Sequence, residues 1–372
     1  MPIFSQSPSA VADLTNLFLI VRFPSLPGVN IFNFDVILIT NSLNTIKGNK
    51  IVKNQEPKIS GCEALLKGPD MLRGKSLLTL RDFSLKEIQF LLTEAINFKK
   101  NRELYRKMAP LTGKALIMIF QKRSTRTRVS AELAMSILGG TTIFLGYEDI
   151  HLGVNESIRD SAMTLGRMAS GILMRVYNHR DLEEMAKYAE IPVLNALSDL
   201  EHPLQGLADL LTIEAHLGTL AGRKVAWIGD GNNVCHALMI ACAKMGLSMN
   251  IASPPKYEPL EEIVTYCKNS ANILITNDPR DAIAEADVVV TDTFISMGQE
   301  NEKAEKLKHF KGYQINGELV KNAKPDFIFM HCLPRHQEEV TDEIFYGPHS
   351  VVFEEAENRL YTVAAVLKSI LT

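Results

Sequence analysis

From residue 71 to the end of the chain, short apolar runs alternate with amphipathic stretches, and this alternation constrains the fold more than any other feature. The apolar runs have the length of β-strands, and helical spacing follows several of them. Strands that alternate with helices form parallel sheets with helices on both faces. The expected strands are residues 115–120, 141–144, 172–176, 193–195, 224–228, 248–252, 273–275, 287–292 and 327–331.

Two such blocks flank a long amphipathic segment, residues 203–217, which begins with Pro203 and is followed by Gly218. Proline in the first turn and glycine just past the last turn are typical of a helix. We therefore predict an α/β protein with two doubly wound parallel-sheet domains joined by long helices. The expected domains are residues 71–203, completed by a C-terminal helix at 355–372, and residues 204–354.

Composition excludes several classes of protein. The 372 residues carry 40 Lys and Arg against 43 Asp and Glu, so the net charge of −3 gives no basic field for nucleic acid. No apolar run reaches the roughly 18 residues of a membrane span. The five cysteines are odd in number and widely spaced, which argues against a disulfide framework and against a zinc ligand pattern.

Residues 1–70 differ from the rest of the chain. They are rich in Asn, Ser, Pro and Ile, they have no clean periodicity, and they carry a weak excess of basic residues. A cleaved mitochondrial transit segment is basic, rich in serine and poor in acidic residues, and this stretch fits that description only in part. The alternatives are a disordered extension and a wrongly assigned gene start.

Polar turns follow five of the expected strands, and ligands of doubly wound folds bind at such turns. The first, residues 121–128, holds four cations in eight residues between a strand and a helix. A helix N-terminus has free N–H groups and a partial positive charge, so this turn suits a phosphate. The alternative interpretation is a solvated basic cap on a surface helix.

The other four turns are individually weaker signals. His202 precedes Pro203 and could donate to a carbonyl oxygen, although a lone histidine is more often structural. The glycine-rich turn at 227–233 lacks the third glycine of a dinucleotide fingerprint, because Val234 takes that place. In the turn at 292–298, Asp292 and Ser296 could hold an ammonium group, and the last turn is residues 331–335.

These motifs, in this order, resemble the ornithine carbamoyltransferase family over residues 70–372. The phosphate turn is shared by all transcarbamylases, whereas the Ser-Met-Gly and His-Cys-Leu-Pro motifs belong to the ornithine branch. Residues 149–157 further resemble the animal mitochondrial enzymes. The motifs are Ser124-Thr-Arg-Thr-Arg128, His202-Pro-Leu-Gln205, Asp292 with Ser296-Met-Gly298, and His331-Cys-Leu-Pro-Arg335.

The resemblance implies transfer of a carbamoyl group from carbamoyl phosphate to the side-chain amine of L-ornithine, giving citrulline and phosphate. It implies no metal and no organic cofactor, a place in the urea cycle or arginine biosynthesis, and a homotrimer with active sites at subunit interfaces. It also implies the mitochondrial matrix as the location, with the cytoplasm as the alternative.

The resemblance also assigns roles to residues by their place in the motifs. Those implied to bind carbamoyl phosphate are Ser124, Thr125, Arg126, Thr127, His151 offered to a neighbouring subunit, Arg175, His202, Gln205, Cys332, Leu333 and Arg359. Those implied to bind ornithine are Asn233, Asp292, Ser296 and Met297. Those implied to be catalytic are Arg126, His202, Asp292, Cys332 and Arg359.

Two positions depart from the family pattern. Gln121 stands where a glutamate is common, and we interpret that glutamate as a partner for one of the arginines of the turn. His336 stands where animal enzymes often have lysine. Three rival functions remain: a transcarbamylase acting on putrescine, aspartate or an acylated ornithine, a nicotinamide enzyme, and a non-catalytic binding protein. The nicotinamide reading predicts an acidic residue after the strand at 248–252, and Ser253-Pro-Pro-Lys256 has none.

Overall fold

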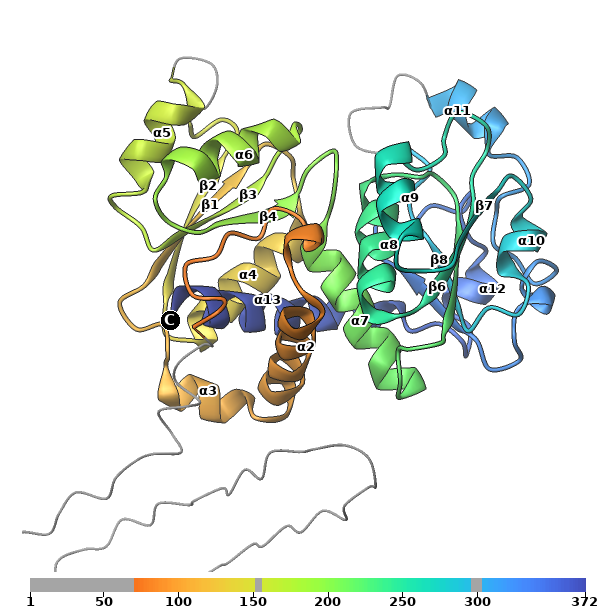
Figure 1. Cartoon of the computed structure of the whole chain (residues 1–372), viewed down its shortest axis with the longest axis horizontal. Helices are drawn as coiled ribbons and strands as arrows, with labels where there is room; N and C mark the ends of the chain where they lie inside the picture. Colours follow the sequence, from red (N-terminus) through yellow and green to blue (C-terminus); the bar gives the residue numbers. More distant parts are fainter. Residues whose placement is uncertain (1–69, 151–155, 296–302) are drawn as a thin grey trace, which may run out of the picture. The chain divides into compact units, whose positions relative to one another are not determined.

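The computed structural model describes residues 70–150, 156–295 and 303–372. Two parallel sheets, each covered by helices, make up this part of the chain (Figure 1). The predicted class, α/β with two doubly wound domains, is confirmed.

The first sheet has the strand order β2-β1-β3-β4, and all its pairs are parallel. Alternate residues of β1 point to opposite faces. Leu116 and Met118 join a cluster with α2, α4 and α13, whereas Ile117 and Ile119 pack with α5 and α6. Because helices cover both faces of this sheet, the sequence of β1 is an unbroken apolar run. The elements are β1 (Ala115–Phe120), β2 (Thr141–Gly146), β3 (Gly171–Arg175), β4 (Val193–Leu197), α2 (Leu85–Lys100), α3 (Arg102–Met108), α4 (Thr125–Ile137), α5 (Ile158–Leu165) and α6 (His179–Tyr188).

The second sheet has the order β7-β6-β5-β8-β9 and is also parallel throughout. Trp227 of β5 packs toward α8 and α9, and its neighbours Ala226 and Ile228 pack toward α10 and α12. The elements are β5 (Lys224–Ile228), β6 (Ser248–Ala252), β7 (Ile273–Thr276), β8 (Val288–Thr291), β9 (Ile328–His331), α8 (Asn233–Met245), α9 (Glu261–Lys268), α10 (Pro279–Ile283), α11 (Lys303–His309) and α12 (Asp342–Phe345).

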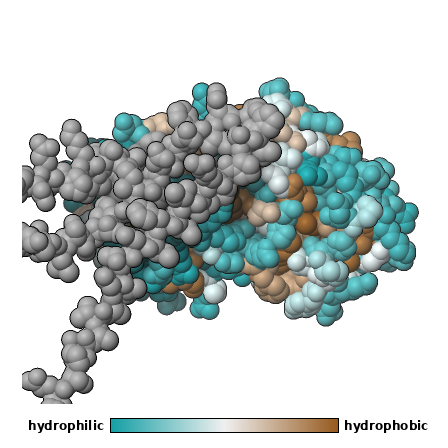
Figure 2. All heavy atoms as spheres, turned by 90° about the horizontal axis from the view of Figure 1, so that it is seen from below, coloured by the Kyte–Doolittle hydropathy of each residue, from teal (hydrophilic) through white to brown (hydrophobic). Residues whose placement is uncertain are grey.

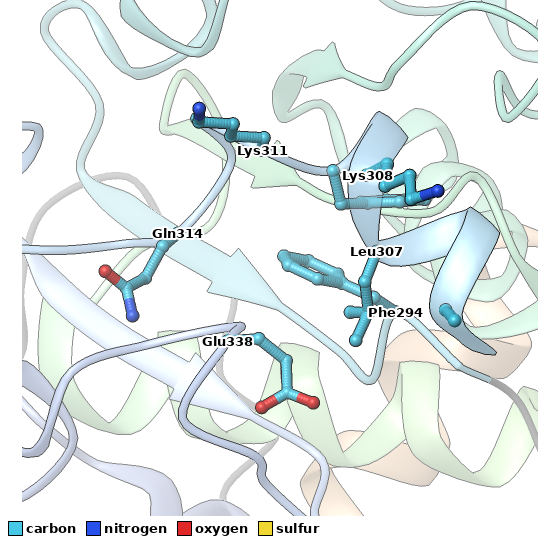
Figure 3. Close-up of a pocket in the computed structure, with 9 residues that line it drawn as sticks. Phe294, Leu307, Lys308, Lys311, Gln314 and Glu338 are labelled. Atoms are coloured by element: carbon cyan, nitrogen blue, oxygen red, sulfur yellow. The ribbon is translucent and has the colours of Figure 1, made fainter.

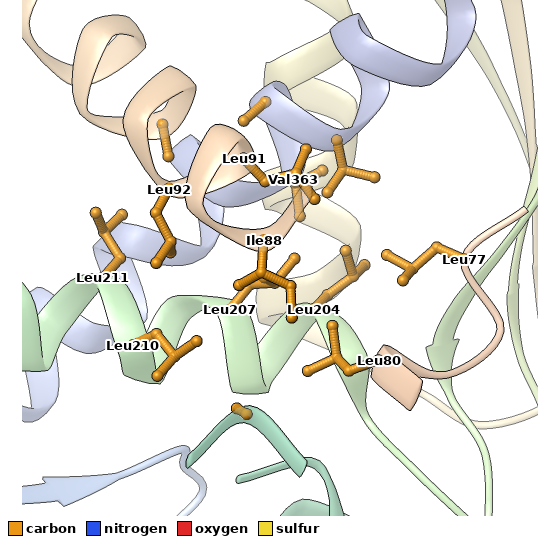
Figure 4. Packing of buried hydrophobic residues seen from close by; sticks show 14 of the residues in the cluster. Leu77, Leu80, Ile88, Leu91, Leu92, Leu204, Leu207, Leu210, Leu211 and Val363 are labelled. Atoms are coloured by element: carbon orange, nitrogen blue, oxygen red, sulfur yellow. The ribbon is translucent and has the colours of Figure 1, made fainter. Parts of the chain in front are cut away.

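Two long helices, α7 (Pro203–Leu217) and α13 (Val352–Leu371), pack against each other and against α2. α7 has the predicted bounds, and α13 begins three residues earlier than predicted because buried Val352 continues its apolar face. α2 begins with a capping box, in which the side chains of Ser84 and Glu87 each accept a hydrogen bond from the other residue's backbone N–H. Figure 4 shows the apolar side chains that α2, α7 and α13 direct toward one another, among them Ile88, Leu91, Leu204, Leu207 and Val363.

The outer surface is mixed in character. Where Figure 2 leaves it uncovered by grey atoms, it is mostly hydrophilic with small apolar areas between. Among the helices of residues 70–150, 156–295 and 303–372, none combines the length and apolar character that crossing a membrane requires. The polar turns that the sequence singled out all lie at carboxyl ends of strands: after β1, β4, β5, β8 and β9.

Candidate active site

The turn between β1 and α4 presents the start of a helix and a basic side chain. Ser124 caps α4, and its hydroxyl accepts a hydrogen bond of 3.3 Å from the N–H of Thr127. Thr125 and Arg126 lie in the first turn of the helix, where backbone N–H groups have no partner within the helix. Arg126 donates a hydrogen bond of 2.5 Å to the carbonyl oxygen of Leu333, in the turn after β9. Two motifs that are 207 residues apart in the sequence therefore meet.

Three arginines converge on this region. Arg175 ends β3 and Arg359 lies on α13, and both are at most 5% exposed. Burial lowers the pKa of each guanidinium to about 10, and the charge of Arg126 contributes to both shifts. The Nε atoms of Arg175 and Arg359 have no hydrogen-bond partner among the described residues. Buried positive charge with unused donors is the environment that a bound anion would stabilise.

His202 lies between β4 and α7 as a neutral donor. Burial, and then the charges of Arg359, Arg175 and Arg126, hold the pKa of His202 well below its usual value. Its Nε2 atom is 3.3 Å from Nη1 of Arg359. Because a guanidinium only donates, Nε2 accepts and the proton sits on Nδ1. That Nδ1–H is buried and has no partner in the described part of the chain, so it is free to donate to a carbonyl oxygen.

Gln205 and Thr127 complete a network around Arg359. The guanidinium donates to Oε1 of Gln205 at 2.6 Å and to the hydroxyl of Thr127 at 3.2 Å. These bonds join α4, α7 and α13, and they hold the arginine next to His202. The amide oxygen of Gln205 is thereby kept at the site as an acceptor, which is the group that an incoming N–H needs.

Asp292 and Cys332, which follow β8 and β9, form the other half of the site. The thiol donates to Oδ1 of Asp292 at 3.0 Å, and Nδ2 of Asn232 donates to Oδ2 at 2.9 Å. Burial, and then the charge of Asp292, raise the pKa of the Cys332 thiol well above its usual value. Cys332 is therefore a thiol rather than a nucleophilic thiolate at neutral pH.

Asn232 and Asn233, at the start of α8, have different partners. The side chain of Asn233 donates to the carbonyl oxygen of Ser198, and the side chain of Asn232 donates to Asp292. The physical reason is the helix start. As the N-cap of α8, Asn232 accepts through Oδ1 from the N–H groups of Val234 and Cys235, and its Nδ2 donates to Asp292, while Asn233 is already the first helical residue. An Asn-Asn pair in sequence does not distinguish these two directions.

Behind Cys332 lies a buried dyad that sequence reasoning missed. Nδ1 of His331 accepts from the N–H of Leu333 at 2.9 Å, so its proton is on Nε2, which donates to Glu339 at 3.0 Å. The dyad holds Leu333 at a φ of 62°, a conformation that is strained for leucine. The signal available in the sequence was an acidic residue eight positions after the histidine motif.

Metal binding finds little support in the described residues. The ligand atoms of Asp292, His331 and Cys332 lie within 4.8 Å of one another. Both ring nitrogens of His331 are occupied by Leu333 and Glu339, and the thiol is committed to Asp292. These side chains satisfy one another without an ion.

Three residues implied by the resemblance, His151, Ser296 and Met297, lie outside the described residues. Next to them in the chain, a cavity of about 410 Å³ borders Phe294 and α11. Phe294 and Leu307 form its middle, and the charged ends of Lys308, Lys311 and Glu338 point away from them (Figure 3). The cavity is therefore apolar and does not extend the polar site.

The side chain of Gln121 is hydrogen-bonded to groups other than the arginines of the turn. Its Nε2 donates to Asp181 at 3.2 Å and its Oε1 accepts from the N–H of Tyr177 at 2.8 Å. The side chain thus joins the end of β1 to the start of α6. A glutamate here would lie beside the carboxylate of Asp181 rather than beside a guanidinium.

We therefore expect Gln121→Glu to affect stability more than phosphate binding. The new carboxylate would face Asp181 without a donor between them, which costs about 1–3 kcal/mol above pH 5. The measurements are the urea midpoint at pH 5 and 8 and the KM for carbamoyl phosphate. An unchanged midpoint with a severalfold shift in KM would restore the sequence-based interpretation.

Glu201, the residue before His202, is a fully buried carboxyl group. It accepts from the N–H of Leu80 at 2.8 Å and from the hydroxyl of Thr79. Burial raises the pKa of Glu201 to about 7, and these two hydrogen bonds offset only part of that effect. The group ties the His202 turn to the segment that precedes α2.

Glu201 makes stability depend on pH in a defined direction. Its folded pKa lies above the unfolded value, so the folded state is favoured while the carboxyl is protonated. Stability therefore falls as the pH rises from about 4.5 to 7, by roughly 3 kcal/mol in all. We expect Glu201→Gln to gain stability relative to the parent between pH 5 and 8 in urea unfolding. The exposed Glu184→Gln is the control, and parallel pH profiles for all three proteins would contradict the assignment.

Comparison with known proteins identifies the class. A family model described as the aspartate/ornithine carbamoyltransferase carbamoyl-P binding domain matches residues 75–215. The corresponding Asp/Orn binding domain matches residues 221–370. Each match contains one of the two sheets, and the second match also contains most of α13. The chain belongs to the aspartate/ornithine carbamoyltransferase family, and the predicted family is confirmed.

Similarity to individual relatives assigns the chain to one branch of this family. The chain is 50% identical to the mitochondrial ornithine carbamoyltransferase of Aquarana catesbeiana over 307 residues, which is 81% of this chain and 88% of that protein. It is 51% identical to the ornithine carbamoyltransferase of Bacillus subtilis over 307 residues, 81% of this chain and 95% of that protein. The solved ornithine carbamoyltransferase of Pyrococcus furiosus is 46% identical, with a TM-score of 0.77 over 81% of this chain and 98% of that one. Within the family, this chain is one of the ornithine carbamoyltransferases.

Proposed function

We propose that the site described above transfers the carbamoyl group of carbamoyl phosphate to the side-chain amine of L-ornithine. The observation that carries this is the meeting of buried arginines, which have unused donors, with the Asp292–Cys332 pair. One half suits a phosphate and a carbonyl, and the other suits an amino acid.

In this proposal the turn at Ser124–Thr127 and Arg175 bind the phosphate. His202 donates from Nδ1 to the carbonyl oxygen, and Gln205 accepts from the carbamoyl amide through Oε1. In the free enzyme Arg126 is bonded to the carbonyl oxygen of Leu333. Substrate binding would exchange that bond for bonds to the phosphate and leave the carbonyl of Leu333 free to accept from the carbamoyl amide.

The amine of ornithine then attacks the carbamoyl carbon. A C–N bond forms, the C–O bond to phosphate breaks, and the phosphate leaves with the electron pair and is a base for the proton that the amine gives up. Negative charge grows on the carbonyl oxygen and on the phosphate. Arg126, Arg359 and the neutral His202 are donors held in advance for that charge. The same cationic surroundings disfavour a protonated amine, which keeps the nucleophile neutral.

For ornithine, we propose that Asp292 and Ser296 hold the α-ammonium and that Asn233 and the N–H of Met297 hold the α-carboxylate. Asp292 is buried next to Asn232 and Cys332, so a cation there would find a carboxylate in a protected environment. For Asn233 to reach the substrate, its bond to Ser198 must open.

The decisive assay measures citrulline from carbamoyl phosphate and L-ornithine. Product is expected only when both substrates are present, with one phosphate released per citrulline. Uncoupled release of phosphate, or none, would leave a binding protein on this fold as the better account.

The proposed domains are residues 71–203 with the helix at 355–372 for carbamoyl phosphate, and residues 204–354 for ornithine. α13 supports the first assignment because it packs on α2 and α4 and carries Arg359, which donates to Thr127 of α4. We also propose a homotrimer in which His151 reaches the phosphate of a neighbouring subunit. Light scattering tests the trimer, and mixing inactive Arg126→Ala with inactive His151→Ala subunits should restore part of the activity if sites are shared.

We propose that residues 1–70 direct the protein to the mitochondrial matrix, where it would serve the urea cycle or arginine biosynthesis. Mitochondrial relatives such as that of Aquarana catesbeiana support this location, while bacterial relatives are equally similar. A fluorescent reporter fused to residues 1–70 is the test, and a diffuse cytoplasmic signal would contradict the proposal.

Residues 1–57 are expected to be dispensable for folding and catalysis, because the family models begin to match at residue 75. A chain that starts at Lys58 should retain its melting temperature and its citrulline-forming activity within about twofold, an effect below ~0.5 kcal/mol. Loss of soluble protein or of activity would show that the removed segment supports the catalytic fold.

A further inference from the structure

Two buried carboxyl groups lie directly behind the polar site. Asp209 is on α7, one turn after Gln205, and Glu355 is on α13, one turn before Arg359. Each is 1% exposed, and the two side chains are within hydrogen-bonding range of each other. The reaction described above uses neither of them.

Both carboxyl groups contact the same amide. Nε2 of Gln205 donates to Oδ1 of Asp209 at 2.7 Å and to Oε1 of Glu355 at 2.8 Å. On the other side, Oε1 of Gln205 accepts from Arg359 at 2.6 Å. Because carboxylate oxygens accept and a guanidinium only donates, these partners determine which end of the amide points where. A flipped amide would set oxygen against carboxylate and NH2 against guanidinium.

The pair cannot carry two negative charges without a large cost. Two carboxylates in contact and out of water favour retention of one proton between them. Burial raises the pKa of both groups, and the charge of Asp209 raises the pKa of Glu355 further. The other charged or titratable groups that act on the pair are Arg359 on α13, Asp292 after β8 and Cys332 after β9.

We propose that Asp209 and Glu355 share one proton and act as a positioning pair that holds Gln205 with its oxygen toward the carbamoyl group. Glu355 also accepts from the N–H of His331 at 2.8 Å, so the pair ties this orientation to the turn that carries Cys332 and Leu333. The inference deepens the role of Gln205 and rests on the proposed function.

A double-mutant cycle with isosteric amides tests the shared proton. In Asp209→Asn or Glu355→Gln, a neutral amide takes the place of the protonated member and one carboxylate remains to accept from Gln205. Each single variant should keep kcat within about fivefold of the parent. In the double variant both neighbours of Gln205 are amides, which can present either an oxygen or an NH2 group. The amide of Gln205 is then no longer held in one orientation, and kcat should fall about 10²-fold. The KM for ornithine should change much less than kcat in all three.

Controls separate positioning from stability. Glu214→Gln lies on the same helix as Asp209 and should leave kcat unchanged, and melting temperatures report the fold of every variant. If each single variant loses as much activity as the double variant, both groups are needed as separate carboxylates. The proposal that they share one proton would then be wrong. If the double variant retains full activity, the pair does not position Gln205.

An infrared measurement tests the proton without any assay. The parent should show the carbonyl stretch of a protonated carboxylic acid at pH 8, and most of its intensity should be lost in either single variant. No such band in the parent would overturn the inference, even if the double variant fails to fold. A parent that lacks citrulline-forming activity but shows the band would contradict the proposed function and leave the shared proton standing.

Discussion

Replacing Arg126 with alanine is expected to lower kcat/KM for carbamoyl phosphate by 10²–10³, about 3–4 kcal/mol of transition-state stabilisation. The side chain lies in the first turn of α4, and in the free protein it reaches across to the carbonyl oxygen of Leu333. It is therefore placed to contact both the phosphate and the oxygen on which charge develops. The value of kcat/KM is measured from steady-state citrulline formation at varied concentrations of carbamoyl phosphate.

Arg128 provides the matched control for this loss. It is on the same helix two residues further on, is exposed, and pairs with Glu132 at 2.8 Å. Arg128→Ala should leave kcat/KM within about threefold, because exposed ion pairs contribute little. The melting temperature of Arg126→Ala should stay close to that of the parent. Turnover of Arg126→Ala within threefold of the parent would remove the residue from the site.

The second large effect concerns the choice of amine. L-Ornithine is expected to be preferred over putrescine, acetylornithine and lysine by at least ~10² in kcat/KM, because a polar site rejects an analogue that leaves a buried group unpaired. Putrescine lacks the α-carboxylate and acetylornithine lacks the free α-ammonium. Lysine keeps both but adds a methylene that displaces the reacting amine. A competition assay with the four amines at equal concentration measures the order.

Asp292→Asn should reduce this preference because it weakens the binding of ornithine. The carboxylate now accepts from Asn232 and from the Cys332 thiol, and an amide in its place removes the charge that an ammonium requires. Removing one partner of a buried charge pair costs ~3–5 kcal/mol. Asp281→Asn, exposed on α10, is the control. Putrescine or acetylornithine outcompeting ornithine in the parent would show that Asp292 does not hold the α-ammonium.

Local patterns sufficed to predict most of the elements. The apolar run of β1 and the Pro203 and Gly218 boundaries of α7 appear where expected, because strand period and helix ends depend on neighbouring residues. The strand-end turns were identified for the same reason. Parallel strands in one doubly wound sheet place their carboxyl ends together, so Arg126 and His202 were expected on the same edge. Cys332 follows a strand of the other sheet, and only the family resemblance implied that it joins them.

Side-chain directions within those turns could not be predicted. The N-cap geometry of α8 turned Asn232 toward Asp292 and Asn233 toward Ser198. Packing of β1 against the start of α6 gave Gln121 its contact with Asp181. In both cases the choice depends on a neighbouring element whose position the local sequence does not contain.

The sequence by itself determined the alternation of strands and helices, the position of the strand-end turns and the family, because each depends on residues close together in the chain. Only the tertiary structure decided the buried groups behind the site. Glu201 contacts Thr79, 122 residues earlier, and Gln205 contacts Glu355, 150 residues later. Acidic residues in a sequence are by default exposed. Their burial, the proton that Asp209 and Glu355 must share, and the tautomers of His202 and His331 come from contacts that exist only after the two domains have packed around α7 and α13.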